Sequence, residues 1–222
     1  MEPSGHATVS LARTALSSGS PDLALNVSND ILTKQPRNVD ALVVRGDALT
    51  SLERTGEAAD SYRTAISVDP ASAQALIGLG RIALASDAPT AEALFLQALQ
   101  HAPRDPVALN DLGIARDLQG HHADAQTAYR QAIALAPSMQ AAQVNLALSM
   151  ALSGQARQGE MLLQPILTDP SATPRMRQIM AAVAAMAHDR ATAEALMKAD
   201  MTPDQVRDAL AAYDLLRQPG SQ

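Results

Sequence analysis

The chain has 222 residues, no cysteine, 47% hydrophobic residues and a formal net charge of −6. This length fits one or two globular domains or one elongated array, and the hydrophobic fraction is sufficient for a continuous core. The lack of cysteine excludes a disulfide framework, a thiolate metal site and a catalytic thiol. The mild negative charge and the scarcity of aromatic residues argue against a nucleic-acid groove, which needs a concentrated basic stripe with interleaved aromatics.

No segment approaches the roughly 20 apolar residues that a membrane-crossing helix requires, so direct membrane insertion by this chain is not expected. Residues 1–19 contain no basic start followed by an apolar run, so no signal peptide is visible. Two alternatives remain open: the protein is cytoplasmic, or an export signal has been trimmed from the sequence.

Prolines divide the chain at a nearly constant period. They are Pro36, Pro70, Pro103, Pro137 and Pro170, at intervals of 34, 33, 34 and 33 residues. Within each interval the pattern predicts two short antiparallel helices joined by a tight turn. A glycine recurs in the first helix as Gly46, Gly80 and Gly113, and an aromatic recurs in the second as Tyr62, Phe95 and Tyr129. Small residues let the two helices approach closely, the aromatic fills the gap toward the next pair, and the proline stops the second helix.

This spacing resembles the tetratricopeptide repeat, whose period is about 34 residues. The resemblance implies an all-α superhelical solenoid of about five to six helix pairs with a C-terminal capping helix. We expect repeats at approximately residues 6–38, 39–71, 72–105, 106–138 and 139–171, and a degenerate pair at 172–201. A capping helix is expected at 202–218 and a disordered tail at 219–222.

The repeats at the two ends depart from the pattern. The first is degenerate, as expected of a terminal repeat, with its turn at Gly19. In the fifth, Gly159 and Leu163 replace the usual alanine and aromatic, and Pro165 predicts a kinked or shortened second helix. The next pair is predicted at Pro174–Ala187 and Arg190–Ala199.

Residues Thr202 to Gln205 form an N-cap and capping-box pattern that opens a final helix to about Gln218. Its apolar positions Val206, Leu210 and Tyr213 predict that it covers the exposed end of the stack. Methionines cluster in the second half of the chain, where they either fill the core or form a pliable binding surface.

The tetratricopeptide resemblance implies that the first helix of each pair lines a concave face that binds partners. With the repeat glycine counted as the eighth position, the second, fifth, ninth, twelfth and thirteenth positions face inward. The candidate partner-binding residues are Asp40, Val43, Asp47, Gln74, Ile77, Arg81, Asn110, Ile114, Asp117, Val144, Asn145 and Leu148.

The predicted groove has an acidic N-terminal end and an apolar floor, a surface that suits an amphipathic helix or an extended apolar peptide. In the alternative interpretation, its apolar side chains pack between helices or are covered by the C-terminal helix. Asn110 and Asn145 either bond to a ligand backbone or bond within the stack. The Lys and Asn clamp typical of tetratricopeptide domains that bind chaperone C-termini is absent, because Val43, Asp47, Ile77 and Arg81 occupy its positions.

Catalytic, metal and cofactor motifs were sought and none was found. His121 and His122 are adjacent in a turn, and no carboxylate other than Asp124 lies at ligand spacing, so we interpret both as solvated loop histidines. The sequence contains no glycine-rich phosphate loop and no nucleophile elbow. We therefore expect a non-enzymatic protein without metal or cofactor.

Residues Asn145 to Arg217 resemble the C-terminal region of TadD-type lipoproteins of tight-adherence (Flp) pilus assembly. The matching features are the junction from Asp169 to Gln178, the turn at Asp189 and Arg190, and the helix entry from Asp200 to Pro203. The resemblance implies a bacterial accessory factor, periplasmic and associated with the outer membrane, that supports the secretin or its partners. Such proteins carry an export signal and a lipidated cysteine, and this sequence shows neither.

The sequence therefore predicts a protein-interaction scaffold of pilus assembly, with a lipid anchor in its full-length form. The competing hypothesis is a cytoplasmic adaptor or secretion chaperone that holds a client peptide in the same groove.

Overall fold

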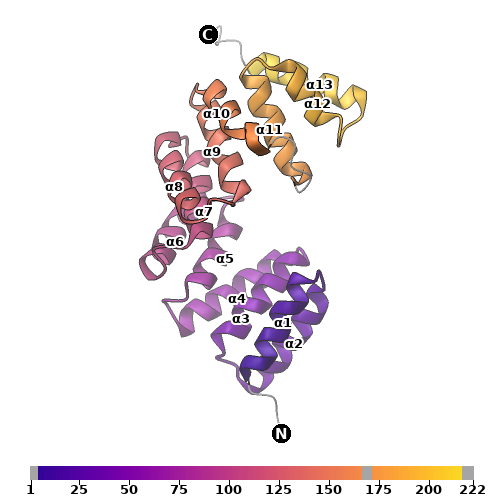
Figure 1. The fold of residues 1–222 in the computed structure, drawn as a ribbon. Coiled ribbons are helices and arrows are strands. Elements are labelled where there is room, and N and C mark those ends of the chain that lie inside the picture. The colour runs from indigo at the N-terminus through magenta and orange to yellow at the C-terminus, as the bar shows by residue number, and fades with distance from the viewer. Residues whose placement is uncertain (1–4, 167–171, 217–222) are drawn as a thin grey trace. The chain divides into compact units, whose positions relative to one another are not determined.

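The computed structural model describes residues 5–166 and 172–216, and their side chains over 9–166 and 172–213. Within these ranges the chain forms thirteen α-helices and one 3-10 turn, and no strand (Figure 1). The predicted all-α class is therefore confirmed. The tail predicted at 219–222 lies outside the described residues, as does Pro170.

The chain consists of two compact units, residues 1–111 and 112–222, and the boundary falls within α7 (Pro106–Leu118). The helices of the first unit are α1 (Gly5–Ser17), α2 (Pro21–Lys34), α3 (Val39–Ser51), α4 (Thr55–Val68), α5 (Ala73–Ala83) and α6 (Ala88–His101). Those of the second are α8 (His122–Leu135), α9 (Gln140–Leu152), α10 (Ala156–Leu163), α11 (Pro174–Met186), α12 (Arg190–Met197) and α13 (Pro203–Leu216).

Helix ends follow the punctuation of the sequence. Pro36, Pro70, Pro103 and Pro137 each lie two residues after the last residue of α2, α4, α6 and α8. The turns inside the pairs use glycines with positive φ, 74° at Gly19, 77° at Gly120 and 84° at Gly154, a conformation that costs glycine little. The division of the chain into individual repeats stays our prediction.

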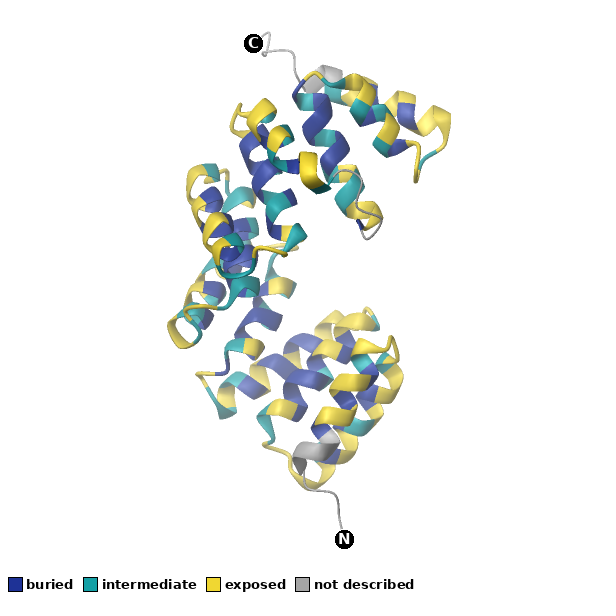
Figure 2. Cartoon of the chain, viewed as in Figure 1, coloured by how far each residue is buried: buried dark blue, intermediate teal, exposed yellow. Residues whose placement is uncertain are grey.

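An aromatic ring packed against a glycine holds each of three helix pairs together. Tyr62, Phe95 and Tyr129 are at most 2% exposed. A Cβ atom added at Gly46 would lie 2.5 Å from the Tyr62 ring, one at Gly80 2.6 Å from Phe95, and one at Gly113 2.7 Å from Tyr129 Cδ1. Any side chain at these glycines would displace the ring. In Figure 2 the buried residues lie along the faces on which neighbouring helices meet.

The fifth pair solves the same packing problem with different residues. Ala147 stands at the glycine position and Leu163 at the aromatic position, and both are buried in one apolar cluster. Because leucine does not reach as far as tyrosine, the first helix can carry a methyl group. The close approach moves to Gly159, where an added Cβ would lie 2.5 Å from the carbonyl oxygen of Ala147. As predicted from Pro165, the second helix is short: α10 ends at Leu163 and a 3-10 turn, Gln164–Ile166, follows.

The C-terminal helices have the predicted positions and a bidentate ion pair that the sequence did not reveal. Thr202 N–H donates to Gln205 Oε1 at 2.9 Å, which confirms the capping box. Val206 and Leu210 of α13 pack with Ala181 of α11 and Met197 of α12 in one buried cluster.

Arg177 of α11 donates through Nε and Nη2 to both carboxylate oxygens of Asp200, at 2.7 and 2.6 Å. This fork links α11 to the loop before α13, and the hydrogen bonds hold the pKa of Asp200 below its ordinary value. Two residues on which the pilus-lipoprotein resemblance rests therefore stabilise this part of the fold.

Two carboxyl groups meet where α10 approaches the start of α12. Asp189 caps α12, accepting hydrogen bonds from Thr192 N–H at 3.0 Å and from the Thr192 hydroxyl at 2.6 Å, which lower the pKa of Asp189. Burial, and then the Asp189 charge and hydrogen bond, raise the pKa of Glu160, against the attraction of Arg157. Two carboxyl groups can share a hydrogen bond only if one is protonated, so Glu160 holds the proton and Asp189 stays ionised.

We predict that Gly159→Ala destabilises the second unit by about 1–3 kcal/mol, because the new methyl group would strike a backbone oxygen that cannot rotate away. Gly56→Ala is the matched control, since nothing lies within 4 Å of a Cβ added there. This control should be neutral or stabilise by up to about 1 kcal/mol through helix propensity. Urea unfolding followed by circular dichroism measures both, and equal stability of the two variants would contradict the packing at Gly159.

We predict that Glu160→Gln raises stability at neutral pH and reduces its loss with rising pH. The folded chain keeps a proton on Glu160 that the unfolded chain releases near the ordinary value of 4.5. The contribution of the shared proton is thus complete below that value and is lost as pH rises through the raised pKa. Glutamine keeps the donor at every pH.

Thermal melts across the acidic to neutral range test this, with the exposed Glu194→Gln as control. Glu194 forms an ion pair with Lys198 at 2.8 Å, and its removal should change stability by no more than about 0.5 kcal/mol. A pH profile of Glu160→Gln identical to that of the unaltered protein would rule out the shared proton.

Candidate functional site

A groove of about 680 Å³ lies in the first unit between α1, α3 and α5. Its wall residues come from three successive helix pairs and from the start of α7. They are Arg13, Leu16, Ser17, Val43, Asp47, Thr50, Ser51, Tyr62, Gln74, Ile77, Gly78, Arg81, Asp105 and Val107. The first helices of the pairs supply most of this lining, which is the arrangement expected from the repeat positions.

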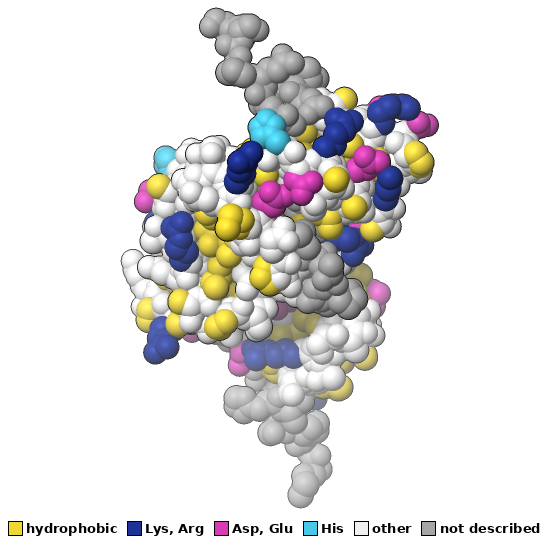
Figure 3. Space-filling view, turned by 45° about the horizontal axis from the view of Figure 1, so that its top comes forward, with side chains coloured by type: hydrophobic (Ala, Val, Ile, Leu, Met, Phe, Trp, Pro, Cys, Tyr) yellow, Lys and Arg dark blue, Asp and Glu magenta, His cyan; other side chains and the backbone are white. Residues whose placement is uncertain are grey.

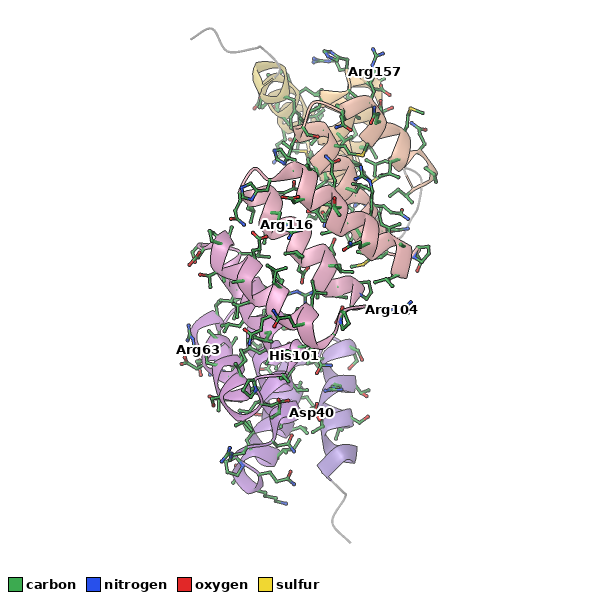
Figure 4. The ribbon with its side chains drawn as sticks, turned by 90° about the vertical axis from the view of Figure 1, so that its left-hand side faces the viewer. Asp40, Arg63, His101, Arg104, Arg116 and Arg157 are labelled. Carbon is green, nitrogen blue, oxygen red and sulfur yellow. The ribbon has the colours of Figure 1, made fainter. Side chains whose placement is uncertain are left out.

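Five of the predicted partner-binding residues come together in this groove: Val43, Asp47, Gln74, Ile77 and Arg81. Val43 and Ile77 are buried and form part of its floor, whereas Gln74 and Arg81 are exposed. Asp40, labelled in Figure 4, lies beside the groove, where its carboxylate accepts a hydrogen bond from Arg13 Nη2 at 2.7 Å. The convergence of these residues is a finding of the structure, and their use in binding stays a prediction.

Asp47 is held at the centre of the groove by Tyr62. The Tyr62 hydroxyl donates to Asp47 Oδ1 at 2.6 Å, and the Tyr62 ring fits against Gly46 and Gly78, neither of which has room for a Cβ atom. The surrounding groove walls exclude water and raise the pKa of Asp47, while the Tyr62 hydrogen bond and then Arg81 and Arg13 oppose this shift. Burial and Asp47 raise the pKa of Tyr62, so the hydroxyl remains a donor.

Arg81 is positioned by a buried carboxylate that was not among the predicted residues. Arg81 Nε donates to Asp111 Oδ2 at 2.6 Å, and the Asp111 side chain is 6% exposed while that of Arg81 is 52% exposed. Burial raises the pKa of Asp111, and the charge and hydrogen bond of Arg81 oppose the shift. A charged residue two positions before Gly113, where Val44 and Gly78 stand in earlier repeats, was the available signal.

Asn110 does not line the groove. It is 5% exposed, and its amide donates to Asp111 Oδ1 at 3.1 Å. Of the two interpretations considered for this residue, bonding within the stack is the one that the structure shows. Asn110 therefore belongs to the support of Arg81 through Asp111.

In the second unit, Asp117 accepts hydrogen bonds from three side chains. Tyr129 Oη donates to Asp117 Oδ2 at 3.0 Å and Ser149 Oγ to Asp117 Oδ1 at 2.7 Å, while His122 Nδ1 lies 2.8 Å from Oδ1. The interpretation of His122 as a solvated loop residue was wrong, because it is the first residue of α8 and its side chain is only 26% exposed. Asp117 ties α7 to α8 and α9.

These contacts do not form a nucleophile of the serine hydrolase kind. Ser149 is fully buried, and its hydroxyl donates to the carboxylate rather than to the imidazole. In the part of the chain that the structure describes, no three His, Asp or Glu side chains gather closely enough to hold a metal ion. No helix within the same residues is both long and apolar enough to cross a bilayer.

The apolar residues predicted for the second half of the groove are packed to different degrees. Val144 is 1% exposed and lies in a core cluster with Leu163 and Met180, against which Leu148 packs while remaining partly exposed. Ile114 packs against the cluster of Tyr129 and Leu146, and Asn145 is partly exposed. Packing between helices, the alternative interpretation, thus describes Val144, whereas Ile114, Asn145 and Leu148 keep part of their surface in solvent.

On the face shown in Figure 3, basic side chains are scattered among acidic and neutral ones. The ion pairs illustrate this mixture: Arg63, labelled in Figure 4, lies 2.9 Å from Asp60, and Arg54 lies 2.7 Å from Glu57. Such exposed pairs contribute little to stability. The candidate site therefore rests on the groove of the first unit and not on a surface field of one sign.

Comparison with solved structures shows the same fold in several proteins. The chain is similar to PilW, described as a widely conserved type IV pilus biogenesis factor, with a TM-score of 0.80, 20% identity, and coverage of 95% of this chain and 100% of that one. It is similar to PilF of Pseudomonas aeruginosa, with a TM-score of 0.76, 16% identity, and coverage of 94% and 97%.

A chain of the APC/C hetero-tetramer Cut9–Hcn1 gives a TM-score of 0.80 at 15% identity and covers 94% of this chain and 42% of that one. Identities this low show the fold alone.

Among curated proteins, the general transcriptional corepressor ssn6 of Schizosaccharomyces pombe is 28% identical over 122 residues, which are 54% of this chain. The chain spans only 11% of the length of that relative. The sequence pattern of the tetratricopeptide repeat matches residues 9–66, 51–108 and 110–156, well over half of the chain. The chain therefore belongs to the tetratricopeptide repeat family.

Proposed function

We propose that this protein is a non-enzymatic interaction scaffold of bacterial tight-adherence (Flp) pilus assembly, and that the groove of its first unit holds a segment of a partner. Tetratricopeptide stacks present extended concave surfaces to other proteins. The observation that carries the proposal is the convergence of Val43, Asp47, Gln74, Ile77 and Arg81 on one groove. An apolar floor with fixed polar groups at its edges suits the capture of a peptide segment.

Two further observations support the assignment to pilus assembly. The fold is shared over nearly the whole chain with PilW, described as a type IV pilus biogenesis factor. The resemblance of residues 145–217 to TadD-type lipoproteins points to the tight-adherence branch of this machinery. Within it, the partner we propose is the secretin or a protein associated with it.

We propose that the full-length form acts at the periplasmic side of the outer membrane, held there by a lipid anchor. Fractionation of cells that produce the full-length encoded protein tests this point. Recovery with the outer membrane, together with metabolic labelling by a fatty acid, supports the proposal. Recovery in the cytoplasm without label contradicts it and favours the competing hypothesis of an adaptor or secretion chaperone.

We predict that filling the groove abolishes function while the fold is retained. Thr50 and Gln74 are exposed and line the groove, so Thr50→Trp with Gln74→Trp should occupy it without disturbing the core. The matched control is Asp30→Trp with Gln100→Trp, at exposed positions of α2 and α6 that do not line it. In cells lacking the gene, the control variant should restore surface Flp pili and assembled secretin, and the groove variant should not.

Circular dichroism melts of both double variants show whether each still folds. Full restoration of pili by a folded groove variant would contradict the proposed use of the groove. Loss of pili with both variants would instead indicate that tryptophan anywhere on the surface is harmful, and it would remove support from the groove.

A further inference from the structure

The charges of the groove are paired in an uneven way. Each of its two arginines has an ion pair with an acid outside the groove lining: Arg13 Nη2 lies 2.7 Å from Asp40, and Arg81 Nε lies 2.6 Å from Asp111. Each of its two aspartates accepts hydrogen bonds from neutral donors, Asp47 from Tyr62, and Asp105 from the backbone of Val107 and Ala108. Two arginines and four aspartates leave the region with an excess of two negative charges.

The two aspartates of the lining differ in how well their charge is compensated. Asp105 precedes α7, and its Oδ1 accepts N–H groups of the first turn at 2.8 and 3.1 Å, where the positive end of the helix stabilises a carboxylate. Asp47 lies inside α3, away from any helix N-terminus, and its printed side-chain donor is one phenol. Of the two, Asp47 is the carboxylate that gains more from an added cation.

The space around Asp47 is apolar on one side and closely defined. Leu16, Val43, Ile77 and Val107 line the same groove, and the glycines that contact Tyr62 let its ring form part of the wall. A segment seated here would bury aliphatic side chains on this floor with one polar group at Asp47. Arg13 and Arg81 would not strongly repel a cation there, because their charges are balanced by Asp40 and Asp111.

We propose that the groove of the first unit takes an apolar peptide segment that carries one lysine or arginine, with its cationic group bound by the Asp47 carboxylate. This inference rests on the proposed function, since it names the chemistry of the segment that the groove holds. Asp47 is then the residue that selects the partner, and Tyr62 positions its carboxylate through the 2.6 Å hydrogen bond. Asp111 and Asn110 act behind Arg81, which they hold at the edge of the groove.

A charge-assisted hydrogen bond in a partly desolvated groove is worth enough to be measured. Such bonds contribute about 1.5–3 kcal/mol, which corresponds to about tenfold or more in affinity. A bound cation also favours the ionised form of Asp47, whose pKa the groove walls raise. Affinity should therefore be complete at neutral pH and fall as acid protonates Asp47.

The test begins with selection of a random-peptide display library against the folded protein and, in parallel, against Asp47→Asn. Asparagine keeps an oxygen that accepts from Tyr62, so the groove should stay formed, and thermal melts of both proteins check this. We expect peptides selected by the unaltered protein to share an apolar pattern with one Lys or Arg, and this enrichment to vanish with Asp47→Asn. Asp30→Asn, at an exposed position outside the groove, should select the same peptides as the unaltered protein.

One selected peptide is then synthesised in three forms, with lysine, norleucine or glutamate at the cationic position, and titrated by fluorescence anisotropy. The lysine form should bind about tenfold more tightly than the norleucine form to the unaltered protein and to Asp30→Asn, and equally tightly to Asp47→Asn. Asp47→Glu, which restores the charge, should recover part of the preference.

Equal binding of the lysine and norleucine forms, or a preference for glutamate, would overturn the cationic inference and leave the proposed peptide groove intact. If no peptide is selected, the inference also fails. The proposed function fails with it only if the tryptophan-filled groove restores pili as well.

Discussion

The contact between an aromatic ring and a glycine is the constraint on which the helix pairs depend. Tyr62, Phe95 and Tyr129 each occupy space that a Cβ atom would need at Gly46, Gly80 or Gly113. The contact fixes how closely two helices approach and leaves the other faces of the first helix free to vary. Where the ring is replaced by Leu163, alanine stands at the glycine position and the close approach moves to Gly159. The ring and the small residue therefore behave as one packing unit.

The same contact builds the candidate site. Tyr62 reaches between Gly46 and Gly78, forms part of the groove wall, and places its hydroxyl on Asp47. Aromatic packing thus positions the carboxylate that gives the groove its polarity, and a buried acid, Asp111, does the same for Arg81. In the second unit the Tyr129 hydroxyl again meets an aspartate, but Asp117 also accepts from Ser149 and therefore ties helices together. Burial and partner number separate the binding role proposed for Asp47 from the structural role of Asp117.

The periodic part of the sequence predicted much of this architecture, because prolines, glycines and aromatics act over short distances. The helix ends, the turn glycines, the short α10 and the capping box at Thr202 follow from local chemistry. The positions of Val43, Asp47, Gln74, Ile77 and Arg81 in one groove follow from counting along the repeat. Contacts between residues far apart in the chain were missed: Arg81 with Asp111, Arg177 with Asp200, and Glu160 with Asp189. Local patterns carry no information about which distant partner a charge will meet.

The central claim is that a partner segment occupies the groove of the first unit in the cell. A photo-crosslinking amino acid placed at Gln74, inside the groove, and separately at Asp30, outside it, tests this most directly. The account predicts a discrete crosslinked product at Gln74 that contains a pilus-assembly protein, and none at Asp30. Absence of a product at Gln74 in piliated cells, or the same product from both positions, would contradict it.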